Sequence, residues 1–274
     1  MKNIPYLLAL HATSGLGSIK LKALIDHFKD PKLAWEAQSK QVSKNLEPEN
    51  YVQDLKKDGI NWLTIFDKDY PKLLKEIYDP PIILYYRGEI KKEDQKAIAI
   101  VGTRSITDYG KIVTRQFAKD LVLNNLTIIS GLARGVDTQA HLAAIESGGR
   151  TIAVLGGGLN KIYPHENKGL AERIIKHGAV ISEFLPNDDP KPGNFPARNR
   201  IISGLSRAVL VTEAAEKSGS LITAKLALEQ GRDVFAIPGP ITSELSKGPI
   251  DLIRAGAIPV TNTQEILEEL TSLL

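Results

Sequence analysis

From Ala97 onward, apolar runs of strand length alternate regularly with amphipathic runs of helical length. The predicted strands are Ala97–Val101, Thr127–Ser130, Thr151–Leu155, Ala179–Ser182, Ala208–Thr212, Val234–Ile237 and Ile258–Val260. The predicted helices are Gly110–Leu123, Val136–Ser147, Asn167–Lys176, Ala197–Leu205, Ser220–Gln230, Pro249–Arg254 and a last helix from Thr263. Continuous apolar strands that alternate with helices indicate a parallel sheet covered on both faces. The sequence therefore predicts an α/β fold with a doubly wound, Rossmann-like parallel sheet.

The first 60 residues have a different pattern. Apolar residues such as Leu21, Leu24 and Phe28 follow helical spacing, which predicts a small all-helical unit. The polar break Lys56–Gly59 suggests a boundary, so we expect a helical domain over 1–60 and an α/β domain over 61–274. Two short strands, Trp62–Phe66 and Ile82–Tyr86, follow the break. Prolines beside these strands predict that they are edge or peripheral elements.

Within the helical unit, Ser14–Lys20 contains two glycines around a leucine, with a lysine just inside the next helix. This arrangement resembles a helix-hairpin-helix element, whose tight turn aims backbone N–H groups at a DNA phosphate. An ordinary turn between two helices uses glycine in the same way, so both interpretations stay open.

The composition limits the classes of protein to be considered. The chain of 274 residues is 42% hydrophobic, has a net charge of +3 and contains no cysteine, which excludes disulfides and thiolate chemistry. Residues 97–207 carry 14 Lys and Arg against 9 Asp and Glu, a net of +5, which suits a polyanionic partner. The sequence shows neither a signal peptide nor a run of about 20 apolar residues, so we expect a cytoplasmic protein without membrane spans.

Glycines and cations follow several of the predicted strands. The segments in question are Gly102–Arg104, Gly131–Arg134 and Gly156–Lys161, while Glu183 and Glu213 follow two other strands. Open parallel sheets bind ligands outside the carboxyl ends of their strands. Glycine at these ends lets the backbone approach a ligand, so we expect an anion-binding site at this edge.

The stretch Phe195–Leu205 adds a second candidate feature. Pro196 is predicted at the start of a helix, and Arg198, Asn199 and Arg200 follow it. N–H groups at a helix start, together with two guanidiniums, form a candidate phosphate-binding corner. The alternative is that Arg198 and Arg200 pair with acidic side chains.

Common cofactor sites are missing from the sequence. The dinucleotide fingerprint requires a second glycine where Arg104 stands, and no Walker A loop is present. The five histidines have no metal-binding spacing, so we expect neither a cofactor nor a metal. Ser218 is interpreted as the cap of the following helix, and Asp137 as a first-turn acid at a helix N-terminus.

Five segments in order resemble the DprA/Smf family of bacterial DNA-processing proteins. They are Val101–Arg104 with Tyr109–Gly110, Ser130–Asp137, Phe195–Leu205, Ser218–Ala224 and Gly231–Gly239. The resemblance covers residues 60–260 closely and the helical N-terminus loosely. It implies an extended Rossmann domain preceded by a helical domain similar to a sterile alpha motif (SAM-like).

The resemblance also implies a function. The family binds and protects single-stranded DNA, loads the RecA recombinase onto it during natural transformation, forms homodimers through the Rossmann domain and is not known as an enzyme. Six residues would contact phosphates: Arg104, Arg134, Lys161, Lys168, Arg198 and Arg200. Others would line the DNA pocket: Ser130, Gly131, Gly156, Gly157, Gly158, Asn160 and Asn199. Phe195, Tyr163 and Tyr109 are candidates for stacking on bases.

Two other functions stay open at this point. The domain also resembles phosphoribohydrolases, whose P-G-G-x-G-T-x-x-E segment supplies a catalytic acid. The corresponding Lys217–Ala224 lacks that acid, although Glu183 and Glu213 leave a nucleotide activity open. A protein adaptor that docks an acidic partner on the basic rim is the third interpretation.

Overall fold

A computed structural model describes residues 2–13, 16–38 and 46–272 of the chain. Its centre is a nine-stranded sheet with the order β1-β2-β6-β5-β4-β3-β7-β8-β9. The strands are β1 (Asn61–Thr64), β2 (Ile83–Gly88), β3 (Ala97–Val101), β4 (Thr127–Ser130), β5 (Thr151–Val154), β6 (Gly178–Ser182), β7 (Ala208–Val211), β8 (Asp233–Ala236) and β9 (Ile258–Pro259). Strands β3 to β9 pair in parallel, and β1 and β2 are antiparallel to their neighbours. The predicted doubly wound sheet is confirmed.

The first parallel strand shows why both faces of the sheet are covered. Along β3 all five side chains are buried, and successive residues point to opposite faces. Ala97, Ala99 and Val101 pack into one hydrophobic cluster, whereas Ile98 and Ile100 pack into another. A strand without a polar face is stable only between two layers of helices.

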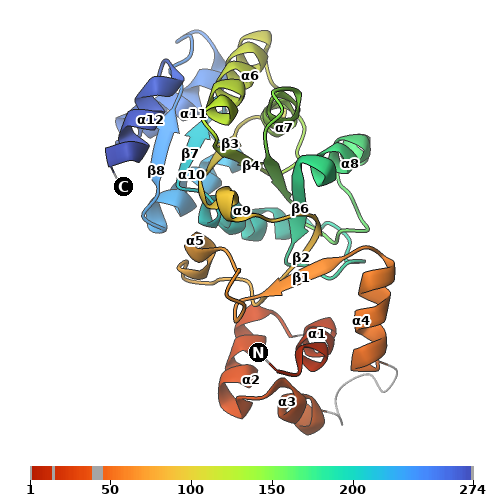
Figure 1. The fold of residues 1–274 in the computed structure, drawn as a ribbon. Coiled ribbons are helices and arrows are strands. Elements are labelled where there is room, and N and C mark those ends of the chain that lie inside the picture. Colours follow the sequence, from red (N-terminus) through yellow and green to blue (C-terminus); the bar gives the residue numbers. More distant parts are fainter. Residues whose placement is uncertain (1, 14–15, 39–45, 273–274) are drawn as a thin grey trace.

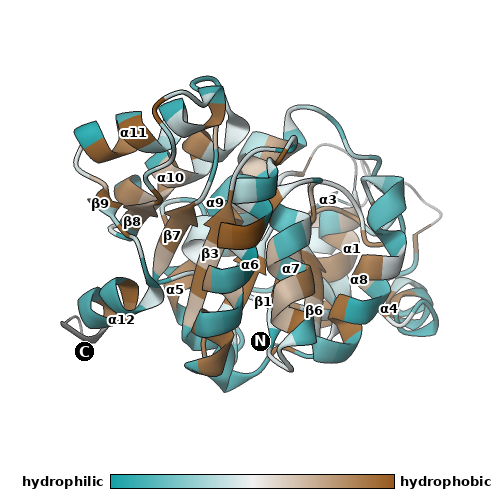
Figure 2. Cartoon of the chain, turned by 90° about the horizontal axis from the view of Figure 1, so that it is seen from above, coloured by the Kyte–Doolittle hydropathy of each residue, from teal (hydrophilic) through white to brown (hydrophobic). Residues whose placement is uncertain are grey.

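Those two layers are formed by the connecting helices (Figure 1). One layer holds α6 (Asp108–Leu123), α7 (Val136–Glu146) and α8 (Lys168–His177), which pack side by side. The other holds α9 (Asn194–Gly204), α10 (Gly219–Glu229) and α11 (Lys247–Arg254), and α12 (Thr263–Ser272) returns to pack on α6. In Figure 2 hydrophobic strands lie between helices whose outward sides are hydrophilic. Short elements complete the fold: α5 (Lys72–Lys75), η1 (Lys92–Gln95), η2 (His165–Asn167) and η3 (Glu244–Ser246).

The N-terminal helices form a unit at one end of the sheet (Figure 1). They are α1 (Ile4–Ala12), α2 (Ser18–Phe28), α3 (Pro31–Gln38) and α4 (Pro48–Lys57). Leu7, Leu8 and Leu10 of α1 are fully buried and belong to the same hydrophobic cluster as Tyr85 of β2. The Tyr85 hydroxyl also lies 3.0 Å from Nδ1 of His11, so the unit packs closely on the sheet. The domain boundary at residue 60 stays a prediction.

Three expectations need correction or qualification. Helix α9 begins at Asn194 instead of Ala197, and α6 begins at Asp108 instead of Gly110. Strand β1 is an edge strand as expected, but β2 has partners on both sides. Its two prolines, Pro80 and Pro81, precede the strand and so remove no ladder hydrogen bond.

The Ser14–Lys20 motif is only partly visible, because Ser14 and Gly15 lie outside the described residues. Gly17 is the N-cap residue of α2, so the motif does lead into a helix. Its contact with DNA stays a prediction. Among the helices of the described residues, none has the length and apolarity needed to cross a membrane.

Candidate nucleic-acid interface

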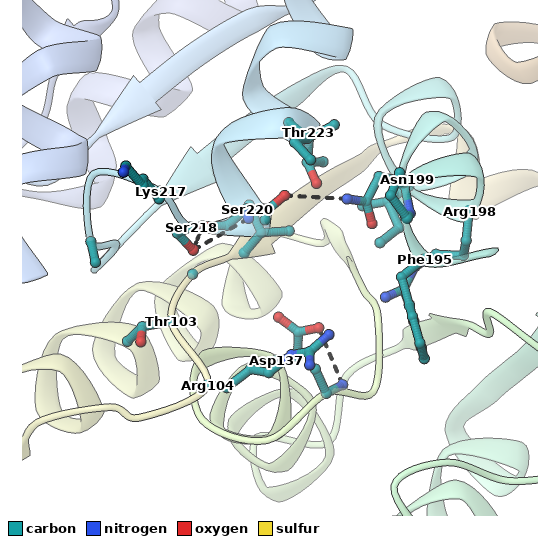
Figure 3. A pocket seen from close by; sticks show the side chains of 18 of the residues that line it. Thr103, Arg104, Asp137, Phe195, Arg198, Asn199, Lys217, Ser218, Ser220 and Thr223 are labelled. Atoms are coloured by element: carbon teal, nitrogen blue, oxygen red, sulfur yellow. Dashed lines mark hydrogen bonds between the residues drawn. The ribbon is translucent and has the colours of Figure 1, made fainter. Parts of the chain in front are cut away.

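The main candidate site is a cavity of about 490 Å³ at the carboxyl ends of β3 and β7 (Figure 3). The sheet order reverses here, because the chain runs outward from β3 to β6 and returns through α9 to β7. Such a switch point is where open α/β sheets bind ligands. The walls come from four places. They are Val101–Ser105 at the end of β3, Ala133 and Asp137 before and within α7, Phe195, Pro196, Arg198, Asn199 and Ile202 of α9, and Ala215, Lys217, Ser218, Gly219, Ser220, Ile222 and Thr223 after β7.

Two exposed cations stand at this cavity. Arg104 follows β3 and Lys217 follows β7, so the cations come from the two strands between which the order reverses. The Arg104 guanidinium lies 5.5 Å from the centroid of the Phe195 ring. The Phe195 ring in turn lies 5.8 Å from the ring of Tyr163. A positive rim beside aromatic rings can hold a phosphate and stack on a base at the same time.

Arg198 lines the same cavity, but its side chain is directed into the protein. Only 4% of the residue is exposed. Its Nη1 donates to the carbonyl oxygen of Gly131 at 2.6 Å and to that of Val154. Burial lowers the pKa of the guanidinium to about 10, and the nearby Asp137 opposes this shift. Nε is buried without a protein partner among the described residues. Arg198 thus ties the loop after β4 to β5, and its phosphate contact stays a prediction.

Arg200 has acidic partners. Its guanidinium nitrogens lie 2.8 and 2.6 Å from the two carboxylate oxygens of Glu183, and Nε lies 3.4 Å from Asp79. The alternative interpretation, pairing with acids, is therefore confirmed for Arg200. The bidentate geometry with Glu183 is the strong form of such a pair. Its contact with a phosphate stays a prediction.

The start of α9 differs from the predicted phosphate-binding corner. Asn194 N–H donates to Lys191 and Phe195 N–H donates to Pro192, while Pro196, the third helical residue, has no N–H. The prediction that Pro196 opens the helix is wrong, because α9 already begins at Asn194. The preceding turn uses the N–H groups of Asn194 and Phe195, and an anion contact at the N–H groups after Pro196 stays a prediction.

The three remaining predicted cations, Arg134, Lys161 and Lys168, lie outside the lining of the cavity. Arg134 is exposed and pairs with Glu166, and Lys161 lies 3.6 Å from Asp189. Lys168 is exposed at the first position of α8. None of these three lines the switch-point cavity. Arg134 lies beside it, because it borders a small recess that Arg104, Phe195 and Tyr163 also border.

Asn160 lies away from the cavity, at the helical unit. Its amide oxygen accepts from Arg87 at 2.6 Å, and its amide nitrogen donates to Asp58 at 3.2 Å and to Asn187 at 2.8 Å. These bonds connect the loop after β5 to the end of α4. Asn199, in contrast, lines the cavity and donates to the carbonyl of Gly219 at 3.3 Å. The DNA contact of each stays a prediction.

The predicted glycines pack against the protein itself. A Cβ on Gly158 would lie 2.2 Å from the carbonyl oxygens of Leu185 and Pro186, and one on Gly156 would lie 2.8 Å from the Phe195 ring. Gly157 is similarly covered by Pro190 at 3.0 Å. The three glycines therefore let the loop 185–190 and the Phe195 ring pack onto the loop after β5. Ser130 is also used internally, because its hydroxyl donates to the carbonyl of Ile100 at 2.7 Å.

Two capping predictions are confirmed. Asp137 lies in the first turn of α7 and accepts N–H bonds from Gly131 at 3.1 Å and Ala133 at 3.2 Å. Burial raises the pKa of its carboxyl, while Arg198 and these hydrogen bonds oppose the shift. Ser218 is the N-cap of α10, and its hydroxyl accepts from the N–H of Ser220. Both residues line the cavity and shape its polar wall.

The two strand-end acids are occupied inside the fold. Glu213 accepts from the Thr107 hydroxyl at 2.5 Å and from its N–H at 3.0 Å, and Glu183 holds Arg200. Neither acid lines the switch-point cavity. In the described ranges, no cluster of three or more His, Asp or Glu is arranged to hold a metal.

Three residues that line the cavity were not among the predicted site residues, namely Lys217, Ser220 and Thr223. Lys217 could have been found, because it follows β7 at the same sheet edge as Arg104. The sequence predicts Ser218 as a helix cap, which is confirmed. The structure shows that the capped end of α10 also forms one wall.

Comparison with known proteins decides the family. A family model described as "DNA recombination-mediator protein A" matches residues 61–271. Protein Smf of Synechocystis is 41% identical over 289 residues, which cover 98% of this chain and 73% of that protein. The chain belongs to the DprA family. The resemblance noted in the sequence is therefore confirmed.

Solved structures of DprA proteins agree with the fold. The crystal structure of DprA from Streptococcus pneumoniae has a TM-score of 0.86 and 37% identity, and the match covers 98% of this chain and 99% of that one. DprA from Helicobacter pylori, whose structure is described as showing a unique single-stranded DNA binding mode, has a TM-score of 0.70 and 33% identity over 78% of this chain and 96% of that one. The helical unit followed by an extended Rossmann-like sheet is thus a DprA architecture.

Proposed function

We propose that this chain binds single-stranded DNA at the switch-point cavity and loads RecA onto the bound strand during natural transformation. The single observation that carries the proposal is the placement of Arg104 and Lys217 at a cavity next to the Phe195 ring. Cations would hold the phosphates, and the ring would stack on a base without reading sequence. The single-stranded DNA binding described for the H. pylori relative supports the same ligand.

We propose the RecA partnership, the homodimer and the cytoplasmic location as well, and membership of the DprA family supports them. A recombination mediator has to hold a strand that enters the cell and give it up to the recombinase. This work requires no bond to be broken, so we propose a binding protein without catalytic activity. Glu183 is hydrogen-bonded by Arg200, and Glu213 by Thr107. These bonds support a binding protein over a phosphoribohydrolase, which would need a catalytic acid.

The test is fluorescence anisotropy with labelled oligo-dT, titrated with salt. We expect the affinity of the wild type to fall steeply with salt, because each neutralised phosphate releases counterions. A double variant, Arg104→Glu with Lys217→Glu, should lose at least tenfold in affinity and show a shallower salt slope. Both side chains are exposed, so the variant should fold normally.

The matched control is Arg254→Glu with Lys225→Glu, which makes the same change of charge on exposed residues. Arg254 is the last residue of α11, and helices run antiparallel to the strands they connect. It therefore lies toward the side of the sheet where the parallel strands begin, away from the cavity at their carboxyl ends. Equal losses in both double variants would contradict the proposal. Failure of the wild type to bind oligo-dT at low salt would favour a nucleotide or an acidic protein as the partner.

A further inference from the structure

Two residues at the start of α9 differ sharply in how they meet the solvent. Phe195 is half-buried beside the switch-point cavity, whereas only 4% of Arg198 is exposed (Figure 3). The two lie three positions apart on the same helix, and residues with this spacing are neighbours on one helix face. The start of α9 therefore carries a buried arginine next to a ring that a ligand can reach.

The buried arginine fixes this part of α9 to the sheet. Nη1 of Arg198 donates to the carbonyl oxygen of Gly131, which follows β4, and to that of Val154, the last residue of β5. A single nitrogen thus joins the ends of two neighbouring strands to the helix. Hydrogen bonds from a charged donor are stronger than those between neutral groups. The position of the α9 start is therefore set by Arg198.

The charge of Arg198 is balanced inside the protein. Asp137 is also buried, and the attraction between the two groups favours the charged form of each. Arg104 and Lys217, in contrast, are exposed at the cavity. The positive charge that a phosphate would meet at the cavity therefore comes from these two exposed side chains.

The Phe195 ring is held from a second side by the loop after β5. A Cβ on Gly156 would lie 2.8 Å from Cδ1 of the ring, so the ring packs against bare backbone two residues after Val154. The Tyr163 ring and the Arg104 guanidinium complete its surroundings. The ring thus has a fixed place before any ligand is bound. A group held in its binding position loses less freedom when the ligand arrives.

We propose that Arg198 is a positioning residue that holds the Phe195 ring as a preformed platform for a DNA base and does not itself contact the strand. This inference rests on the proposed function, because it assigns a role within the same site. It divides the work at the site in two. Exposed Arg104 and Lys217 hold phosphates, while Arg198 and the backbone of Gly156 fix the ring.

The test compares two labelled oligonucleotides by fluorescence anisotropy, each titrated with salt. One is oligo-dT, and the other has the same length and backbone but abasic residues in place of thymidine. Wild type should bind oligo-dT at least tenfold more tightly, because stacking requires a base. Arg198→Met keeps a long apolar side chain without donors, and should reduce this preference to less than threefold. Its salt slope should equal that of wild type, because no phosphate contact is lost.

Gly156→Ala moves the ring without changing any charge, and it keeps the test decisive if Arg198→Met does not fold. It should reduce the preference for oligo-dT in the same way, again at an unchanged salt slope. Gly193→Ala is the matched control. Gly193 is the N-cap of α9, and a Cβ there meets nothing within 4 Å, so this variant should keep the tenfold preference.

A double variant separates the positioning role from general damage to the site. Phe195→Leu removes the ring and should itself reduce the preference for oligo-dT to less than threefold. Adding Arg198→Met to Phe195→Leu should then change the preference by less than twofold, because no ring is left to position. The single and double variants together form a cycle that measures the coupling of the two residues.

Three results would overturn the inference. One is a full preference for oligo-dT in folded Arg198→Met, and another is equal binding of both oligonucleotides by wild type. The third is an equal loss of affinity for both oligonucleotides in Arg198→Met with a shallower salt slope, which would make Arg198 a phosphate ligand. Failure of the proposed function gives a different result, since wild type would then bind neither oligonucleotide at low salt.

Discussion

The Nη1 atom of Arg198 donates to the carbonyl oxygen of Gly131 at 2.6 Å, and the guanidinium occupies the space where any other residue at 131 would place its Cβ. A Cβ on Gly131 would lie 2.3 Å from Nη1. The glycine at the end of β4 is thus required by a buried arginine of the protein itself. This relationship connects the loop after β4 with α9 and leads to the first prediction.

Gly131→Ala should destabilise the fold by about 2 kcal/mol, because the buried guanidinium has to move and overpacking of this kind is costly. The measurement is urea unfolding followed by circular dichroism. Gly169→Ala on α8 is the control, since a Cβ there meets nothing within 4 Å and should stabilise the helix by about 0.5–1 kcal/mol. Equal stability of the two variants would show that Arg198 is not fixed as described.

Thr107→Ala should cost about 2 kcal/mol of unfolding free energy. The Thr107 hydroxyl caps α6 by accepting from the N–H of Gly110 at 3.0 Å and donates to buried Glu213. The alanine variant loses the cap and one hydrogen bond of the carboxylate. Thr107→Ser keeps the hydroxyl, so its free energy of unfolding, measured with urea, should remain within about 0.5 kcal/mol of that of wild type. Similar losses for serine and alanine would contradict the capping role.

His141 should make stability fall at acidic pH. Burial lowers its pKa from 6.5 to about 3 in the folded state, with a smaller contribution from Arg198. Because the folded pKa lies below the unfolded one, this stabilisation is complete above pH 6.5 and is lost as the pH falls toward 3. Between pH 7 and pH 5 the loss from this group should be about 2 kcal/mol.

The measurement is the difference between urea unfolding free energies at pH 7 and pH 5 in wild type and in His141→Gln. Other titrating groups contribute to both proteins, including half-buried His11, whose pKa desolvation lowers to about 4. The variant should therefore lose about 2 kcal/mol less than wild type over this range. Identical losses would show that His141 is not the titrating group.

The fold was largely predictable because its strands have no polar face. Runs such as Ala97–Val101 are apolar at every position, and the structure buries them between two helix layers. The start of α9 was missed because a proline at a helix start suggested position one, whereas the chain already turns into the helix at Asn194.

The site was predicted in its position and less well in its details. Arg104 was predicted from its place at a strand end and Asn199 from the family resemblance, and both line the cavity. The acid that pairs with Arg200 could not be inferred, because Glu183 lies 17 residues away in the sequence and meets it only in the folded chain. The packing of Gly156 against Phe195 likewise depends on tertiary contacts that no local motif records.

The most direct measurement is photo-cross-linking of the full chain to single-stranded oligonucleotides that carry 5-iodouracil, followed by mass spectrometry of the peptides. The account predicts adducts on Phe195 and Tyr163, whose rings lie 5.8 Å apart beside Arg104, and their loss in the Arg104→Glu, Lys217→Glu variant. Adducts confined to aromatic residues elsewhere, such as Trp35 and Tyr51 of the helical unit, would contradict the assignment of the switch-point cavity as the DNA site.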